Sequence, residues 1–255
     1  MLNCHFESTL NEMKRECEKS KITRLKKGNV VVKVKKKRTD KKTSWPTKAA
    51  MQQVYEQRLW GTNGDEFYSG EGSHDESLVA TYIEGISAFL KSFKEPITIC
   101  DLGCGDFNIG RQFVPFVGTY LAVDIVPELI AHNSTTFDAP NLEFLCLDIA
   151  KDDLPKADCA ILRQVLQHLS NAEVAAVVNK LHCFKYVILT EHVPEGEYVP
   201  NLDIISGQGI RLKKQSGINL LNPPFSMEVK KKEMLLSQHS VNHPGVIITT
   251  LFQMF

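Results

Sequence analysis

The sequence predicts an α/β fold in which a parallel sheet carries a ligand site at the carboxyl ends of its strands. Apolar segments of strand type lie near residues 97–101, 119–124, 143–147, 158–162 and 185–190. They alternate with segments of helical periodicity, a pattern typical of a parallel sheet covered by helices on both faces. The first strand runs into a glycine turn directly after Asp101, and the second strand ends in another acid, Asp124.

The helical segments are set by periodicity and by capping residues. Apolar residues recur at three- and four-residue spacing over 78–93, and Pro96 ends that pattern. Pro127 begins a shorter helical pattern, and Ser170 with Glu173 has the spacing of a capping box at the start of another helix. The β-branched residues 246–255 suit a final strand, with residues 233–236 as its partner.

Composition excludes several classes of protein. The chain has 255 residues, of which 43% are hydrophobic, enough for a sizeable core. No run of 18 apolar residues and no secretory signal pattern occurs, so we expect a cytoplasmic protein without a membrane span. Seven cysteines include no CxxC pair, which disfavours a zinc site or a disulfide framework, and no metal is expected. The oligomeric state stays open.

Charge divides the chain unevenly. Residues 1–50 contain fifteen Lys and Arg but five Asp and Glu, although the whole chain has a formal net charge of zero. This excess predicts a basic leader over 1–48, followed by an N-terminal lid and helices over 49–95 and a ligand-binding core over 96–255. The leader is either a solvated tail or a surface for phosphate or another anion.

A glycine-rich segment, residues 60–74, follows a helical start near Met51. Its aromatic residues, Tyr68 among them, are costly to leave in water without a purpose. The segment could fold over a ligand as a lid, or it could be a surface loop with a buried aromatic anchor.

The glycine turn distinguishes between two nucleotide-type ligands. Gly103 and Gly105 can adopt positive φ and allow a ligand close to the backbone, and a helix opening after the turn would complete a cradle. A dinucleotide fingerprint needs a third glycine, but Asn108 stands at that place. S-adenosylmethionine has no pyrophosphate. It needs glycines that let the ligand approach the backbone closely, but it does not need the complete phosphate-binding motif.

Four motifs in this order resemble the class I S-adenosylmethionine-dependent methyltransferases. They are Asp101-Leu-Gly-Cys-Gly105, Asp124, Leu147-Asp148-Ile149 and Val165-Leu-Gln-His168-Leu. The resemblance covers about residues 49–225 and implies a Rossmann-like, seven-stranded, mostly parallel sheet of strand order 3-2-1-4-5-7-6, with the last strand antiparallel. Residues 55–74 and 201–225 look like a bacterial branch that we associate with glycan or small-molecule substrates.

The resemblance implies a role for each cofactor-binding position. The glycine turn would lie under the methionine and ribose of S-adenosylmethionine, and its acid would order the turn or reach the amino group. The acid after the second strand would accept the ribose hydroxyls, unless it only caps a helix. The residues implied are Asp101, Gly103, Gly105, Asp124, Ile125 (adenine face), Asp148 and Ile149 (adenine amino group and ring), and Arg163 (methionine amine through its backbone, or a substrate anion through its side chain).

Two histidines are candidate catalytic residues. His168 follows the fourth strand, and His192 follows the fifth, so both open onto the same edge of the sheet. An unperturbed histidine can accept a proton near neutral pH, which an oxygen nucleophile requires. The alternative is that His168 bonds the backbone and only packs its turn.

Tyr68, Asp203 and Arg211 are candidate substrate-binding residues. Arginine matches carboxylate geometry, although Asp203 and Arg211 could instead pair and fix their loop. Residues 222–225 spell the N-P-P-F motif of methyltransferases that act on amino groups of nucleobases or glutamine. That motif must directly follow the fourth strand, so here two prolines more simply fix a bend.

These inferences predict methyl transfer from S-adenosylmethionine, leaving S-adenosylhomocysteine, to a hydroxyl, carboxylate or amine of a small molecule or glycan. One alternative is a protein or nucleic-acid methyltransferase guided by the basic leader, although a nucleic-acid partner is disfavoured. The others are a non-catalytic scaffold, against which the intact turn and acids argue, and a nicotinamide oxidoreductase, which lacks its third glycine.

Overall fold

The computed structural model describes residues 45–64, 67–239 and 244–255. The chain divides into two units, Met1–Lys42 and Thr43–Phe255, and the described residues all belong to the second. The predicted basic leader therefore lies outside the described residues except for its last four positions.

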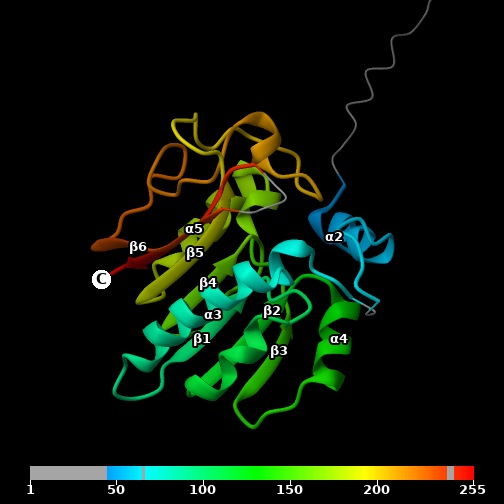
Figure 1. The fold of residues 1–255 in the computed structure, drawn as a ribbon, viewed down its shortest axis with the longest axis vertical. Helices are drawn as coiled ribbons and strands as arrows, with labels where there is room; N and C mark the ends of the chain where they lie inside the picture. Colours follow the sequence, from blue (N-terminus) through cyan, green and yellow to red (C-terminus); the bar gives the residue numbers. More distant parts are fainter. Residues whose placement is uncertain (1–44, 65–66, 240–243) are drawn as a thin grey trace, which may run out of the picture. The chain divides into compact units, whose positions relative to one another are not determined.

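Seven strands of the described chain form one sheet in the order β3-β2-β1-β4-β5-β7-β6 (Figure 1). Neighbours from β3 to β5 pair in parallel, whereas β7 pairs antiparallel with both β5 and β6. This confirms the predicted strand order. The bounds are β1 (Thr98–Leu102), β2 (Thr119–Asp124), β3 (Leu142–Cys146), β4 (Cys159–Arg163), β5 (Tyr186–Val193), β6 (Lys231–His239) and β7 (Val246–Gln253).

The helices include the three that the sequence predicts over 78–93, from Pro127 and after Ser170. In the capping box, Ser170 accepts a hydrogen bond from Glu173 N, and the Glu173 carboxylate accepts one from Ser170 N. No helix in the described part of the chain is long and apolar enough to cross a membrane. The α-helices are α2 (Thr47–Glu56), α3 (Glu76–Lys91), α4 (Pro127–Thr136) and α5 (Asn171–Leu181), and the 3-10 turns are η1 (Glu71–Ser73), η2 (Gly110–Gln112), η3 (Val114–Phe116), η4 (Leu166–His168) and η5 (Arg211–Lys214).

The predicted helix after the glycine turn is wrong. Only the two 3-10 turns η2 and η3 connect β1 to β2. Pro115 removes a backbone donor from this short connection, and Phe107 is held in the left-handed region with φ +60°. The buried Phe107 ring packs edge-on against Tyr120, Phe137 and Phe144. The cradle therefore lacks the helix N-terminus that would favour a phosphate.

The sheet separates two apolar layers. Side chains alternate along β1, so Ile99 packs with α3 on one face while Cys100 and Leu102 pack with α5 on the other. Figure 1 shows α3 lying across the near face of the sheet. With both faces covered, the carboxyl ends of β1 to β5 are left as the edge at which a site can open.

The buried strand β7 gives a test of the fold. Phe252 is 3% exposed and belongs to the α5 layer, where it lies opposite Val187 of β5. We predict that Phe252→Ala lowers the free energy of unfolding by about 3–5 kcal/mol, because a buried ring leaves a cavity. Urea unfolding followed by circular dichroism measures the change. Phe255, which is 60% exposed, supplies the matched control, and an equal loss for Phe255→Ala would contradict this role of β7.

Candidate active site

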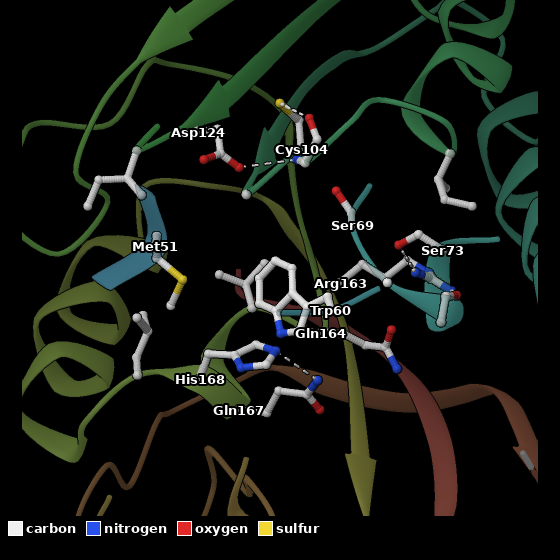
Figure 2. A pocket seen from close by; sticks show the side chains of 18 of the residues that line it. Met51, Trp60, Ser69, Ser73, Cys104, Asp124, Arg163, Gln164, Gln167 and His168 are labelled. Carbon is white, nitrogen blue, oxygen red and sulfur yellow. Dashed lines mark hydrogen bonds between the residues drawn. The ribbon is translucent and has the colours of Figure 1, made fainter. Parts of the chain in front are cut away.

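A cavity of about 650 Å³ opens at the carboxyl edge of the sheet. Its wall is drawn from the ends of β1 to β5, from α2 and from the segments near residues 59–73 and 208–213 (Figure 2). All eight predicted cofactor-binding residues and both predicted histidines line it: Asp101, Gly103, Gly105, Asp124, Ile125, Asp148, Ile149, Arg163, His168 and His192.

Glycine is required at both positions of the turn after β1. Gly103 has φ +93° and Gly105 has φ +57°, in the region that side chains disfavour. A Cβ at Gly103 would lie 2.4 Å from Val165, and one at Gly105 would lie 2.4 Å from the Ser69 hydroxyl. The turn thus brings bare backbone to the cavity wall.

Asp124 joins the end of β2 to this turn. One carboxylate oxygen accepts a hydrogen bond from Gly105 N at 3.1 Å, and the other accepts one from Val126 N at 3.1 Å. Burial raises the pKa of the carboxyl, and these backbone donors act against the rise. Each oxygen retains a lone pair for a ligand hydroxyl, so capping and ligand binding are compatible roles.

Asp101 is a second buried acid in the same wall. Tyr120 donates its hydroxyl to the carboxylate at 2.9 Å. Burial raises the pKa of Asp101 to about 7, with the Asp124 charge adding to the rise and the Tyr120 hydrogen bond and Arg163 opposing it. Two buried acids side by side favour a ligand that carries positive charge.

Asp148 and Ile149 form the turn after β3. One Asp148 oxygen accepts from Ala150 N at 3.1 Å, and the other pairs with Lys151 Nζ at 2.6 Å. Asp148 therefore caps its own turn and also lines the cavity. The Ile149 carbonyl accepts from Lys180 Nζ at 3.0 Å, which ties the turn to α5.

Arg163 ends β4, and its half-buried side chain has a buried Nε. It donates to the Ser73 hydroxyl at 3.2 Å and to the Gly72 carbonyl, and its centre lies 4.8 Å from the Tyr82 ring centroid. Its Nε has no hydrogen-bond partner, and no carboxylate of the described chain lies within ion-pair distance. An unpaired cation at a cavity wall favours an anionic ligand group.

His168 is held as a neutral imidazole. Its Nδ1 lies 3.1 Å from the Gly207 carbonyl, which can only accept, so Nδ1 carries the proton and Nε2 carries the lone pair. Burial lowers the pKa of His168 to about 4. The Trp60 ring lies over it, with centroids 5.1 Å apart (Figure 2). His168 is therefore a hydrogen-bond acceptor at neutral pH, and a weaker base than an unperturbed histidine.

Gln167 connects the two histidines, a role that the sequence analysis missed. Its amide nitrogen lies 3.4 Å from His168 Nε2, and its amide oxygen accepts from His192 N at 3.1 Å. The sequence offered no indication of this role, because a single glutamine such as Gln167 within a turn belongs to no recognisable motif. Cavity residues likewise missed are Met51, Tyr55, Trp60, Gln164, Gln208 and Lys213.

The glycine-rich segment lies against the glycine turn. One Asp106 oxygen accepts from Ser69 N and from His74 Nε2, both at 2.7 Å. Asp106 N in turn donates to the Ser69 hydroxyl at 2.8 Å. The pairing of residues more than thirty positions apart was invisible in the sequence, whereas the aromatic and glycine content of the segment did signal a special role.

The three predicted substrate residues do not line the cavity. Tyr68 stacks on His74, with centroids 4.5 Å apart. Asp203 accepts from Asn171 N at 2.7 Å and from Ile204 N at 2.9 Å. Arg211 is 1% exposed, and backbone carbonyls take most of its hydrogen bonds. Asp203 and Arg211 form no ion pair either, so each fixes the loop separately.

The N-P-P-F stretch also lies outside the cavity wall. It belongs to the connection between β5 and β6, where the Pro223 carbonyl accepts from Asn201 Nδ2 at 2.9 Å. This agrees with the interpretation that residues 222–225 fix a bend.

Comparison with known proteins agrees with this geometry. Residues 99–184 match the family model described as "Methyltransferase domain". No protein of curated function matches the chain.

Several solved structures share the fold at low sequence identity. N-methyltransferase NodS from Bradyrhizobium japonicum, solved with S-adenosylhomocysteine, is 10% identical with a TM-score of 0.56, over 80% of this chain and 98% of that chain. A SAM-dependent methyltransferase of Leishmania major is 13% identical with a TM-score of 0.56, over 80% and 82%. The N-terminal domain of EvdMO1, solved in the presence of S-adenosylhomocysteine and D-fucose, is 15% identical with a TM-score of 0.52, over 80% and 96%. Residues 99–184 thus match a methyltransferase domain, and the described chain has the fold of solved S-adenosylmethionine-dependent methyltransferases.

Proposed function

We propose that the protein transfers the methyl group of S-adenosylmethionine to a small-molecule or glycan acceptor by in-line displacement. The observation that carries the proposal is the meeting of the glycine turn, Asp124 and the β3 turn on one cavity wall with two histidines. A bound S-adenosylmethionine supplies the reactive methyl on a positively charged sulfur.

The charges of the wall support this cofactor. Asp101 and Asp124 are buried acids whose pKa values are raised, and a cation beside them would favour their ionised forms. Asp124 would accept the ribose hydroxyls while it holds Gly105. Asp148 and Ile149 would contact the adenine, with Ile125 on its face. A dinucleotide-binding site would need an α-helix whose N-terminus follows the glycine turn. The described connection after this turn contains only 3-10 turns, so a dinucleotide cofactor is disfavoured.

The acceptor side of the cavity supports a small polar molecule. Trp60 offers a flat apolar surface, and Gln164, Gln167 and Gln208 offer amide groups around it. A sugar or another hydroxylated ring combines an apolar face with hydrogen-bonding edges, which suits this mixture. Among the structural neighbours, NodS is an N-methyltransferase and the EvdMO1 domain was solved with D-fucose. The proposed acceptor group is therefore a hydroxyl, a carboxylate or an amine. We also propose that the enzyme is cytoplasmic.

The chain's part in the reaction is mainly alignment and exclusion of water. Trp60 and the glycine-rich segment cover the cavity. Nε2 of His168 would accept a hydrogen bond from the acceptor's O–H or N–H in exchange for its 3.4 Å contact with the Gln167 amide nitrogen, and so direct the nucleophilic lone pair. Because the pKa of His168 is lowered to about 4, full proton removal by this group before methyl transfer is unfavourable at neutral pH. His192 is the second proposed polar contact on the same wall.

Removal of the Asp124 charge tests the cofactor assignment. We predict that Asp124→Asn raises the dissociation constant of S-adenosylhomocysteine about 10- to 100-fold, because charge-assisted hydrogen bonds to two hydroxyls are weakened. Isothermal titration calorimetry measures the affinity, with the exposed Asp153→Asn as the control. Unchanged affinity would refute the role of Asp124, and wild-type binding of NADH in place of S-adenosylhomocysteine would refute the cofactor.

The Arg163 cation gives a separate test. We predict that Arg163→Gln weakens S-adenosylhomocysteine about tenfold and leaves 5′-methylthioadenosine, which lacks the amino-acid part, within threefold, since the guanidinium would face the carboxylate. The exposed Arg111→Gln serves as the control. Equal weakening of both ligands would show that Arg163 only shapes the cavity. An unchanged affinity for both ligands would show that Arg163 does not contact the cofactor, and would leave a contact with the acceptor as its role.

A further inference from the structure

We propose that Arg211 is a positioning residue for His168: its buried guanidinium holds the turn η4 so that the proton-free Nε2 of His168 is presented to the acceptor. This inference rests on the proposed function, because that function supplies the acceptor that His168 would contact. It stands on contacts outside the cofactor wall, and it assigns Arg211 a task other than the substrate contact that the sequence predicts.

The guanidinium of Arg211 binds the carbonyl groups of the turn. Nη1 donates to Leu166 O at 3.0 Å and to Gln167 O at 3.4 Å, and Nη2 donates to Leu169 O at 2.7 Å. The residue is 1% exposed. A planar fork with fixed donors can hold several carbonyls in one arrangement, which a lysine cannot reproduce. The turn that it holds supplies Gln167, His168 and Leu169 to the cavity wall.

The loop that ends in Arg211 also holds His168 directly. Gly207 N donates to the His168 carbonyl at 3.0 Å, and the Gly207 carbonyl accepts from His168 Nδ1 at 3.1 Å. Arg211 Nε returns to Leu202 O at 3.1 Å, and Nη2 also donates to Asn171 Oδ1 at 2.7 Å. The loop over residues 202–211 is thereby closed on itself by the bond from Arg211 to Leu202, and the two Gly207 bonds and the guanidinium hold it to η4.

The charges around the turn favour the neutral imidazole. Burial is the main cause of the lowered pKa of His168, and the Arg211 charge lowers it further, while the carbonyls near Gly207 act against the shift. Glu191 of β5 and Asp203 of the loop are the acids that act on Arg211. Burial raises the pKa of Glu191 to about 8, although the Arg211 charge opposes the rise.

A merely structural arginine and a positioning arginine differ in what happens to the imidazole. A structural role requires only that the fold survives. A positioning role requires that loss of the fork releases the Gly207 carbonyl from His168, which frees Nδ1 to exchange its proton with Nε2. The ring would then populate both tautomers, and its pKa would rise toward that of an exposed histidine because the opened turn relieves the burial that is the main cause of the lowered pKa.

The test is ¹⁵N NMR of the His168 ring in the full chain, recorded as a function of pH. We expect the wild-type ring to be protonated at Nδ1 and bare at Nε2, and to stay neutral down to about pH 5. Arg211→Lys should give a mixture of tautomers and a titration midpoint raised by about one pH unit or more. Arg111→Lys, at an exposed site that does not line the cavity, should behave as the wild type.

Three results would overturn the inference: a wild-type ring protonated at Nε2, an Arg211→Lys ring with the wild-type tautomer, or an unchanged titration midpoint. Should Arg211→Lys fail to fold, Asn171→Ala removes one partner of the guanidinium at 2.7 Å and should move the same two signals by less. Affinity for S-adenosylhomocysteine separates the two proposals. A wild-type protein that does not bind it refutes the function, whereas the tautomer alone decides the role of Arg211.

Discussion

The hydrogen bond from Gly105 N to the Asp124 carboxylate is the interaction on which the site depends. It joins the turn after β1 to the end of β2, at the edge where the parallel strands all finish. Because Gly103 and Gly105 both have positive φ and no room for a Cβ, the turn has one backbone path. The same carboxylate that fixes this path is the proposed ribose acceptor. A change at Asp124 would therefore alter the shape of the turn and the proposed ribose contact together.

The cavity around the Gly105–Asp124 hydrogen bond is lined by charged side chains. Several of them lack a partner of opposite charge among the described residues. Among the residues that the structure describes, Asp101 and Asp124 have no cationic partner at ion-pair distance, and the Arg163 guanidinium has no carboxylate at that distance. Such groups cost folding free energy unless a ligand supplies the opposite charge. A zwitterionic amino-acid tail on a cationic sulfur supplies both signs. The cost thus falls at the place where the cofactor is proposed to bind, as is common at functional sites.

The predictable part of the structure is the part governed by local rules. Alternation of strand and helix patterns, the turn glycines and the Ser170–Glu173 capping box each act through neighbours in sequence, and all are present in the structure. The helix expected after Gly105 failed because burial of Phe107 and the presence of Pro115 override a helical connection. Strand order followed from resemblance and could not be reached from periodicity alone.

The unpredicted part depends on contacts between distant segments. Arg211 looked like a substrate residue because arginine suits anions, yet its donors meet the carbonyls of a turn some forty residues earlier in the chain. Glu173 was expected to cap α5, and it also accepts the hydroxyls of Thr47 and Ser206. Asp106 with His74 forms another such pair. Sequence spacing carries no information on these distances, because only the folded sheet brings the segments together.

A crystal structure of the full chain with S-adenosylhomocysteine would show whether Asp124 binds the cofactor while it holds the glycine turn. We expect the ribose hydroxyls to lie within hydrogen-bond distance of the Asp124 carboxylate, with the sulfur over the turn at Gly103. We also expect the adenine to lie beside Asp148 and Ile149. A nucleoside bound elsewhere in the cavity, with Asp124 still bonded only to Gly105 and Val126, would contradict this expectation.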